Sequence, residues 1–285
     1  MKSLSALCGC DLAGGAKIEG IQQILGKDIQ RYGNAVVAMR KADADPDQVS
    51  LFGSFAARKL LEAGCVAVLC RMDPTRLLVL REFQIRGKYA LAERHPASID
   101  WRGDVLSEKK AGWTDTVSPD KFIRSLLGGH MAEVMWVDAI AALAQISETD
   151  PALAESKWID ELIGYYDDSR QKREQQAAEA PPQDGAGGGQ DKKPADPRAE
   201  LGLLSILRTQ AETTFSTLSK GVHVEFVVDR ETIFDNGTIL EQMRLATKLL
   251  TQIAFVSHLN DCNFNAMSPA DALKLVLQIE GEIEK

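Results

Sequence analysis

Apolar side chains recur every three or four positions along most of this chain, the spacing of one face of an α-helix. The pattern is clear over residues 18–41 and returns over residues 51–70. In the second of these segments the only charged residues are Arg58, Lys59 and Glu62. A helix that is apolar nearly all round is normally buried, so this segment is expected to lie in the core.

Capping residues and prolines predict where the helices begin. Ser50 is expected to cap the segment that follows it, and Thr238 with Glu241 forms a capping box. Four further pairs combine a capping residue with a proline suited to the first helical position: Asp73-Pro74, Ser118-Pro119, Asp150-Pro151 and Ser268-Pro269. The helices of the first part are expected near residues 18–41, 50–72, 74–95, 119–147 and 151–171.

The predicted fold is an all-α bundle of about seven to nine helices. Residues 1–171 form its first helical part, residues 172–198 a flexible linker or long exposed loop rich in Gln, Ala, Pro and Gly, and residues 199–285 a second helical segment. The pattern leaves open whether the two parts form one domain or two. Residues 222–228 alternate between apolar and polar, and we interpret them as an extended crossing because no partner strand is visible.

Composition and charge indicate the cellular compartment of the protein and limit the kinds of partner it is expected to bind. Hydrophobic residues make up 45% and aromatic residues 6% of the 285 positions, which favours helices over a sheet. A net charge of −8 argues against a surface that attracts nucleic acid everywhere. Five cysteines without a spaced framework suit the reducing cytoplasm, and no uninterrupted apolar run is long enough to span a membrane.

One stretch is locally basic. Residues 71–94 hold six bases against three acids: Arg71, Arg76, Arg81, Arg86, Lys88 and Arg94 against Asp73, Glu82 and Glu93. Arginines five residues apart spread around a helix instead of forming one stripe. We therefore expect an ordinary solvated helix, with phosphate binding as the alternative.

Arg124 and His130 are the candidate catalytic residues, since they lie six positions apart in Arg124-Ser125-Leu126-Leu127-Gly128-Gly129-His130. A histidine can exchange a proton near neutral pH, and an arginine stabilises charge on a scissile phosphate. The pair resembles the arginine-to-histidine motif of HEPN ribonucleases, which are all-helical. That resemblance implies metal-independent RNA cleavage, usually at a homodimer interface. The alternative is that His130 is a half-buried residue of a core helix.

A second resemblance to HEPN-like proteins concerns binding. It rests on Arg58 and Glu62 within residues 57–62, and on the Ser-x-x-x-His segment that runs from Ser219 to His223 and continues to Glu225. In that class an arginine and a glutamate project from one helix while such a segment ends another. The resemblance implies a polar pocket formed by Arg58, Glu62, His223 and Glu225. An internal salt bridge or a surface stripe is the simpler interpretation of Arg58 and Glu62.

Motifs for cofactors and metals are missing from the sequence. It has no phosphate-binding glycine loop, no dinucleotide fingerprint and no zinc-ligand spacing, so we expect no cofactor and no structural metal. The expected function is that of a non-catalytic HEPN-like helical module acting through a protein or RNA partner. A HEPN-type endoribonuclease using Arg124 and His130 is the alternative. The resemblance also implies a setting in bacterial stress or defence.

Overall fold

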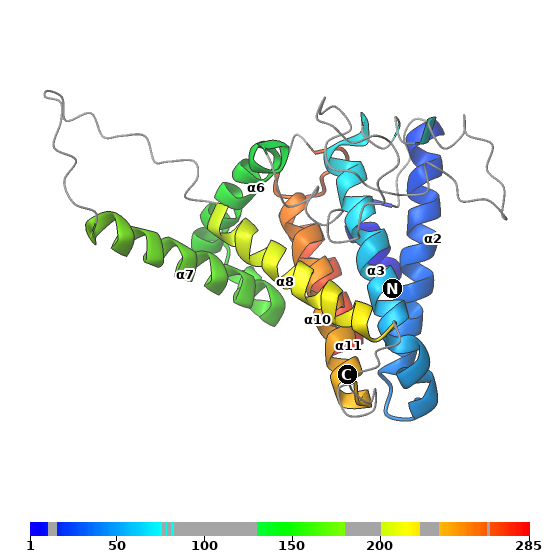
Figure 1. The fold of residues 1–285 in the computed structure, drawn as a ribbon. Coiled ribbons are helices and arrows are strands. Elements are labelled where there is room, and N and C mark those ends of the chain that lie inside the picture. The colour runs from blue at the N-terminus through cyan, green and yellow to red at the C-terminus, as the bar shows by residue number, and fades with distance from the viewer. Residues whose placement is uncertain are drawn as a thin grey trace, which may run out of the picture.

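Helices are the only regular elements in the part of the chain that the structure describes. The computed structural model describes residues 1–10, 16–75, 130–179, 201–222, 234–260 and 263–285, with positions 78, 81 and 82. The elements are α1 (Lys2–Leu7), α2 (Ala16–Met39), α3 (Pro46–Met72), α6 (His130–Thr149), the 3-10 helix η1 (Pro151–Glu155), α7 (Lys157–Glu179), α8 (Leu201–Lys220), α10 (Asn236–Ser257) and α11 (Pro269–Ile283). For these residues, the prediction of an all-α bundle is confirmed (Figure 1).

Helices α3 and α10 form the most extensive pair and the centre of the bundle. Helix α2 packs along α3 as the other arm of a hairpin, while α8 contacts both α3 and α10. Helix α1 contacts both α2 and α11. Elements from before and after residues 180–200 therefore share one core (Figure 1).

Two glycines of α3 allow α10 to approach closely. A Cβ atom on Gly64 would lie 2.5 Å from Leu250 Cδ1, and one on Gly53 would lie 2.5 Å from Ile239 Cγ2. Non-bonded carbon atoms do not come this close. The backbones of α3 and α10 can therefore approach to this distance only because these two positions carry no side chain.

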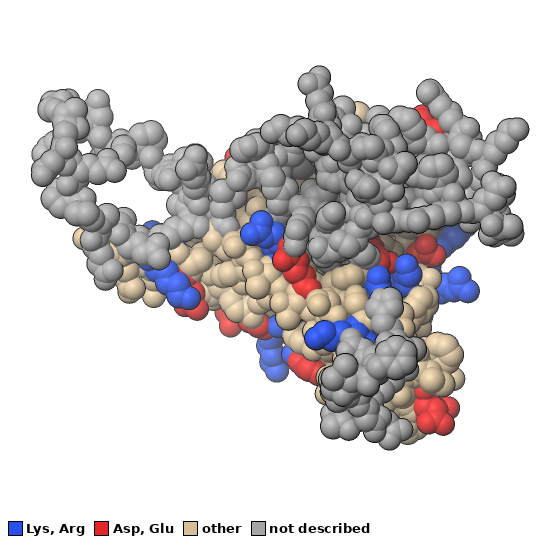
Figure 2. Space-filling model, viewed as in Figure 1, with Lys and Arg blue, Asp and Glu red and all other residues tan. Residues whose placement is uncertain are grey.

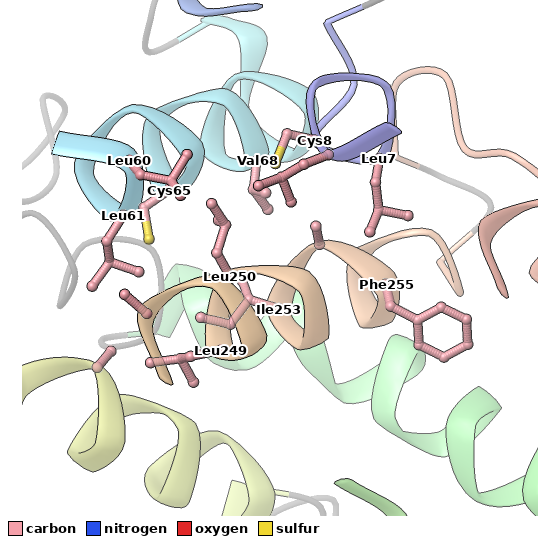
Figure 3. Packing of buried hydrophobic residues seen from close by; sticks show 14 of the residues in the cluster. Leu7, Cys8, Leu60, Leu61, Cys65, Val68, Leu249, Leu250, Ile253 and Phe255 are labelled. Carbon is pink, nitrogen blue, oxygen red and sulfur yellow. The ribbon is translucent and has the colours of Figure 1, made fainter. Parts of the chain in front are cut away.

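The core is apolar and continuous across α1, α3 and α10 (Figure 3). Leu60, Leu61, Cys65 and Val68 of α3 face α10, whose residues 246–257 are all buried. Leu7 and Cys8, at the end of α1, close one side of this layer. The first residues of the chain show no helical pattern long enough to be recognised in the sequence, yet they contribute fully buried side chains to the core.

Buried polar side chains in α10 bond to nearby backbone. Thr247 Oγ1 donates to Met243 O at 2.9 Å and Thr251 Oγ1 to Thr247 O at 2.8 Å, both one turn back along the helix. Gln252 Nε2 donates to Trp158 O at 2.7 Å, which links α10 to α7. These bonds satisfy the buried donors of all three side chains, while the acceptor Gln252 Oε1 has no hydrogen-bond partner among the described residues.

Two of the predicted helix starts are confirmed. Ser268 caps α11, with its Oγ accepting from Asp271 N at 3.2 Å. Asp150 caps the next element through a 3.0 Å bond from Ala152 N. That element is the short 3-10 helix η1, however, and α7 begins only at Lys157.

Two other predicted caps were wrong. Asp45 caps α3, accepting from Asp47 N at 3.0 Å with Pro46 at the first helical position, so Ser50 lies inside the helix. Asp235 caps α10, accepting from Thr238 N at 2.6 Å, so Thr238 is itself helical. In both cases an aspartate three to five residues upstream provides the capping carboxylate, and the helix starts earlier than the apolar pattern does.

The predicted linker begins too early, because α7 continues to Glu179. Residues 172–179 are polar, but Lys, Glu, Gln and Ala are all good helix formers. Arg170 Nε and Glu174 Oε1, one turn apart, form an ion pair at 3.1 Å that supports this extension. The polar composition that suggested a linker is also typical of a solvated helix.

Several predictions fall on residues outside the described ranges. These are most of the 74–95 helix, the start signal at Ser118-Pro119, the linker beyond residue 179 and most of the alternating segment 222–228. Within the described ranges, none of the helices combines the length and the apolar character needed to cross a membrane.

Candidate functional site

Three large apolar side chains of α3 point away from the core. Leu51 is 59% exposed, Phe52 57% and Phe55 41%. They occupy consecutive turns of one helix face, and we call Leu51, Phe52 and Phe55 the α3 patch. Tyr32 of α2 lies beside it, with its ring edge-on to Phe55 at a centroid separation of 6.0 Å.

The exposed patch corrects the expectation that residues 51–70 are buried throughout. The C-terminal half of α3 is buried as expected, with Leu60, Leu61 and residues 63–72 inside the bundle. The N-terminal half packs against α10 at Gly53 and against the end of α8 at Ser54, while Leu51, Phe52 and Phe55 on its outer side remain exposed to solvent. Apolar composition alone does not distinguish a core position from a surface that another molecule covers.

A charged group continues the same side of α3 beyond the patch. Arg58 Nε lies 3.6 Å from Glu62 Oε1, and Lys59 Nζ lies 2.7 Å from Glu62 Oε2. The Arg58 and Glu62 side chains are 16% and 20% exposed, so they are half-buried. The Arg58 guanidinium also stacks over the Phe215 ring of α8 at 4.7 Å.

The end of α8 meets α3 at Ser54, which lies between Phe52 and Phe55 in the sequence. A Cβ on Gly221 would lie 2.8 Å from Ser54 Cβ, so the backbone after α8 passes directly over α3 there. Of the predicted pocket, the structure brings Arg58 and Glu62 together, while His223 and Glu225 lie outside the described residues.

The structure does not describe the side chains of the two predicted catalytic residues. Arg124 lies outside the described residues, and His130 is the first residue of α6, with a side chain that the structure does not describe. Whether the two side chains converge stays a prediction.

Arg71 and His258 form a buried polar contact that the sequence did not reveal. Arg71, at the end of α3, is 0% exposed and His258, at the end of α10, is 1% exposed. Arg71 Nη1 lies 2.7 Å from His258 Nδ1, and Nη2 donates to Ala254 O at 3.1 Å. His258 Nε2 lies 2.8 Å from Leu7 O, while Met267 N donates to Nδ1 at 3.1 Å. A neutral ring with its proton on Nε2 satisfies both of these bonds.

Burial determines the protonation states of the two side chains in this contact. It lowers the pKa of His258 to about 3, with the Arg71 charge acting in the same direction. It also lowers the pKa of Arg71 to about 10, so the guanidinium is still charged at neutral pH. Arg71 was expected on a solvated basic helix. That expectation was wrong, because the guanidinium bonds to carbonyl groups at the meeting point of α1, α3 and α10.

Gly9 makes room for this arginine. It adopts a φ of +85°, which favours glycine, and a Cβ there would lie 3.1 Å from Arg71 Cδ. The flanking Cys8 is fully buried, and burial raises the pKa of its thiol to about 12. The thiol is therefore protonated at neutral pH, which makes it a packing residue and a poor nucleophile.

A second ionic network joins α7, α10 and α11 on another side of the bundle. Lys248 Nζ bonds Glu161 Oε1 at 2.7 Å, and Glu161 also accepts from the Tyr165 hydroxyl. Its bond to Lys248 holds the pKa of Glu161 below its usual value despite the opposing effect of burial. The buried Glu280 accepts from Ser156 Oγ at 2.6 Å and from Lys157 N at 3.1 Å. That carboxylate stabilises the first turn of α7, so this network serves the fold.

Metal-ligating side chains do not gather anywhere within the described ranges: no group of three or more His, Cys, Asp or Glu residues could hold an ion there. The described polar clusters are paired ions at helix ends and in the core. In the α3 patch, by contrast, Leu51 and Phe52 are more than half exposed, and the arrangement is suited to contact with another molecule.

Comparison with models of protein families, with curated proteins and with solved structures gave no match for this chain.

Proposed function

We propose that the chain is a non-catalytic, HEPN-like helical module that acts by binding another protein through the α3 patch. The single observation that carries this proposal is the exposure of Leu51, Phe52 and Phe55, two of them by more than half, on one face of a helix whose other half is core. Aromatic and leucine side chains at such positions are typical of protein contact surfaces.

The size of the patch supports a contact role. A phenylalanine or leucine side chain offers roughly 150–200 Å² when fully accessible, so these three present about 300 Å² of apolar surface. That area is at the lower end of the range of about 300–600 Å² for the largest apolar patch on a typical monomer, and such patches are often functional. Charge at Arg58, Lys59 and Glu62 lies at one border, as in interfaces whose apolar centre has a polar rim.

A protein partner fits this surface better than RNA does. RNA recognition draws on positive charge along the phosphate backbone, and this chain has a net charge of −8.

We further propose that the protein acts in the cytoplasm. Cys8, Cys65 and Cys70 are buried thiols that form no disulfide. Unpaired cysteines are typical of a reducing compartment. The proposed setting in bacterial stress or defence rests on the resemblance to HEPN-like proteins alone.

The proposal is tested by capture from cells that express the tagged full chain, compared with a Leu51→Ser/Phe52→Ser variant. Proteins retained by the wild type and lost by the variant would be specific partners of the patch. An Arg170→Ser/Glu174→Ser variant on α7 is the matched control, because it changes two exposed residues far along the chain and keeps the patch. The control is expected to capture what the wild type captures.

Two results would contradict the proposal. One is an identical set of captured proteins for the wild type and the patch variant. The other is RNA cleavage by the purified chain that is abolished by Arg124→Ala or His130→Ala, since this would establish the ribonuclease instead.

A further inference from the structure

The hairpin formed by α2 and α3 carries charge of opposite sign on either side of the α3 patch. At its tip, Asp43, Asp45 and Asp47 are exposed, and Lys41 is the one exposed base among them. The tip therefore has a net charge of −2, three acids against one base. Figure 2 shows acidic side chains at this end of the molecule.

On the other side of the patch, basic residues outnumber acidic ones. The contact between Tyr32 and Phe55 fixes the pairing of the two antiparallel helices, so residues before Tyr32 lie level with residues after Phe55. Four bases and two acids lie there: Lys27, Arg31, Arg58 and Lys59, with Asp28 and Glu62. This basic band has a net charge of +2, and Figure 2 shows basic side chains higher along the hairpin, separated from the acidic tip by uncharged surface.

The two charged regions are equally far from the middle of the patch. Asp47 lies six residues before Gly53 and Lys59 six residues after it, about 9 Å in each direction along a helix. A two-fold axis perpendicular to α3, passing just outside the patch at the level of Gly53, would place the acidic tip of one chain opposite the basic band of another. It would also place Phe52 near its own counterpart and Leu51 near Phe55. The face is therefore complementary to itself, as an isologous interface requires.

We propose that the partner of the α3 patch is a second copy of this chain, packed antiparallel through the α2–α3 hairpin, with Asp47 of each copy facing Lys59 of the other. This inference rests on the proposed function of the patch as a protein-binding surface. The apolar area of about 300 Å² per copy is small, so the dimer is a weak one that forms at micromolar concentrations.

Sedimentation of the full chain over a range of micromolar concentrations tests the proposal. The wild type is expected to shift from monomer to dimer, and more readily at low salt because the charged contacts are exposed. Phe52→Ser is expected to raise the dissociation constant about tenfold or more. Asp47→Lys and Lys59→Glu are each expected to weaken self-association about tenfold, because like charges then face each other twice in the dimer.

The decisive sample is an equimolar mixture of the Asp47→Lys and Lys59→Glu chains. In a mixed dimer both facing pairs again have opposite charge, so the mixture is expected to associate about as tightly as the wild type. No other kind of partner predicts this rescue. Circular dichroism of each variant confirms that it is folded before it is mixed.

A wild type that stays monomeric at every concentration, or a mixture that associates no better than its components, would overturn the second-copy proposal. If the wild type is monomeric but still captures a cellular protein that Leu51→Ser/Phe52→Ser loses, the proposed function stands and only the identity of the partner is wrong. If the wild type dimerises and Phe52→Ser has no effect on the dimer, the interface lies elsewhere and this inference fails.

Discussion

Arg71 and His258 are polar residues that lie fully inside the core. A buried guanidinium is costly unless its donors are satisfied, and here the carbonyl groups of Leu7 and Ala254, at the ends of two helices, accept from Nη1 and Nη2, while Nε has no partner within the described part of the chain. The imidazole accepts from Met267 N. This contact was not predictable, because the residues lie 187 positions apart and neither belongs to a motif.

Acid is predicted to destabilise the protein through His258. The unfolded histidine takes up a proton near its ordinary pKa of 6.5, whereas the folded one has a pKa of about 3. The unfolded state therefore binds more protons over this range, so this contribution to stability is complete above pH 6.5 and is lost as pH falls towards 3. The expected slope is about 1.4 kcal/mol per pH unit, measured by urea unfolding at a series of pH values.

His258→Asn isolates this effect from that of the carboxylates. The variant is less stable at pH 7, but its stability is expected to change little between pH 6.5 and pH 5.5, where few carboxylates titrate. If the wild type and the variant have parallel pH profiles over that interval, the histidine is not held neutral by the fold.

At the level of helices, the boundaries depend on single carboxylates. Asp45→Ala is predicted to cost about 1 kcal/mol in the free energy of unfolding, because it removes the side-chain acceptor for Asp47 N at the start of α3. Asp43→Ala, two residues earlier and exposed, is the control and is expected to change stability by less than about 0.5 kcal/mol. Chemical denaturation of both variants decides the matter, and equal stabilities would show that Asp45 is not the cap.

The close approach of α3 and α10 yields a second prediction. Gly64→Ala is expected to destabilise the fold by about 1–3 kcal/mol, because the added methyl group would overlap Leu250. Gly164→Ala in α7 is the matched control: a Cβ there meets nothing within 4 Å, so the change is expected to stabilise the helix by up to about 1 kcal/mol. Thermal unfolding of both variants measures the contrast, and a neutral Gly64→Ala would mean that the helices are further apart.

The positions of the helices were largely predictable, but their ends were not. Apolar periodicity identified α2 and α3, because each buries one face or more against a neighbour, and the start signals at Thr238 and Ser268 identified α10 and α11. These patterns misplaced the starts of α3 and α10, where the first turn is polar and the capping aspartate precedes the pattern. They also ended α7 too early, since a solvated helical segment has no apolar face to detect.

At the scale of the whole molecule, the candidate site was only half predictable. Arg58 and Glu62 were recognisable as charges in an apolar helix, and they do pair. The exposure of Leu51, Phe52 and Phe55 was not, because it depends on which sides of α3 the neighbouring helices cover. A periodic pattern shows that one face of a helix is apolar. That face can be covered by the rest of the same chain or by another molecule.

The central claim is that the α3 patch serves binding and not folding, and the unfolding free energy of Leu51→Ser/Phe52→Ser tests it most directly. Both side chains are already more than half exposed, so the double variant is predicted to lose about 1 kcal/mol or less. Leu60→Ala/Leu61→Ala is the comparison on the same helix: both residues are 0% exposed, and the pair should cost about 5 kcal/mol or more. A patch variant as unstable as the core variant would contradict the claim.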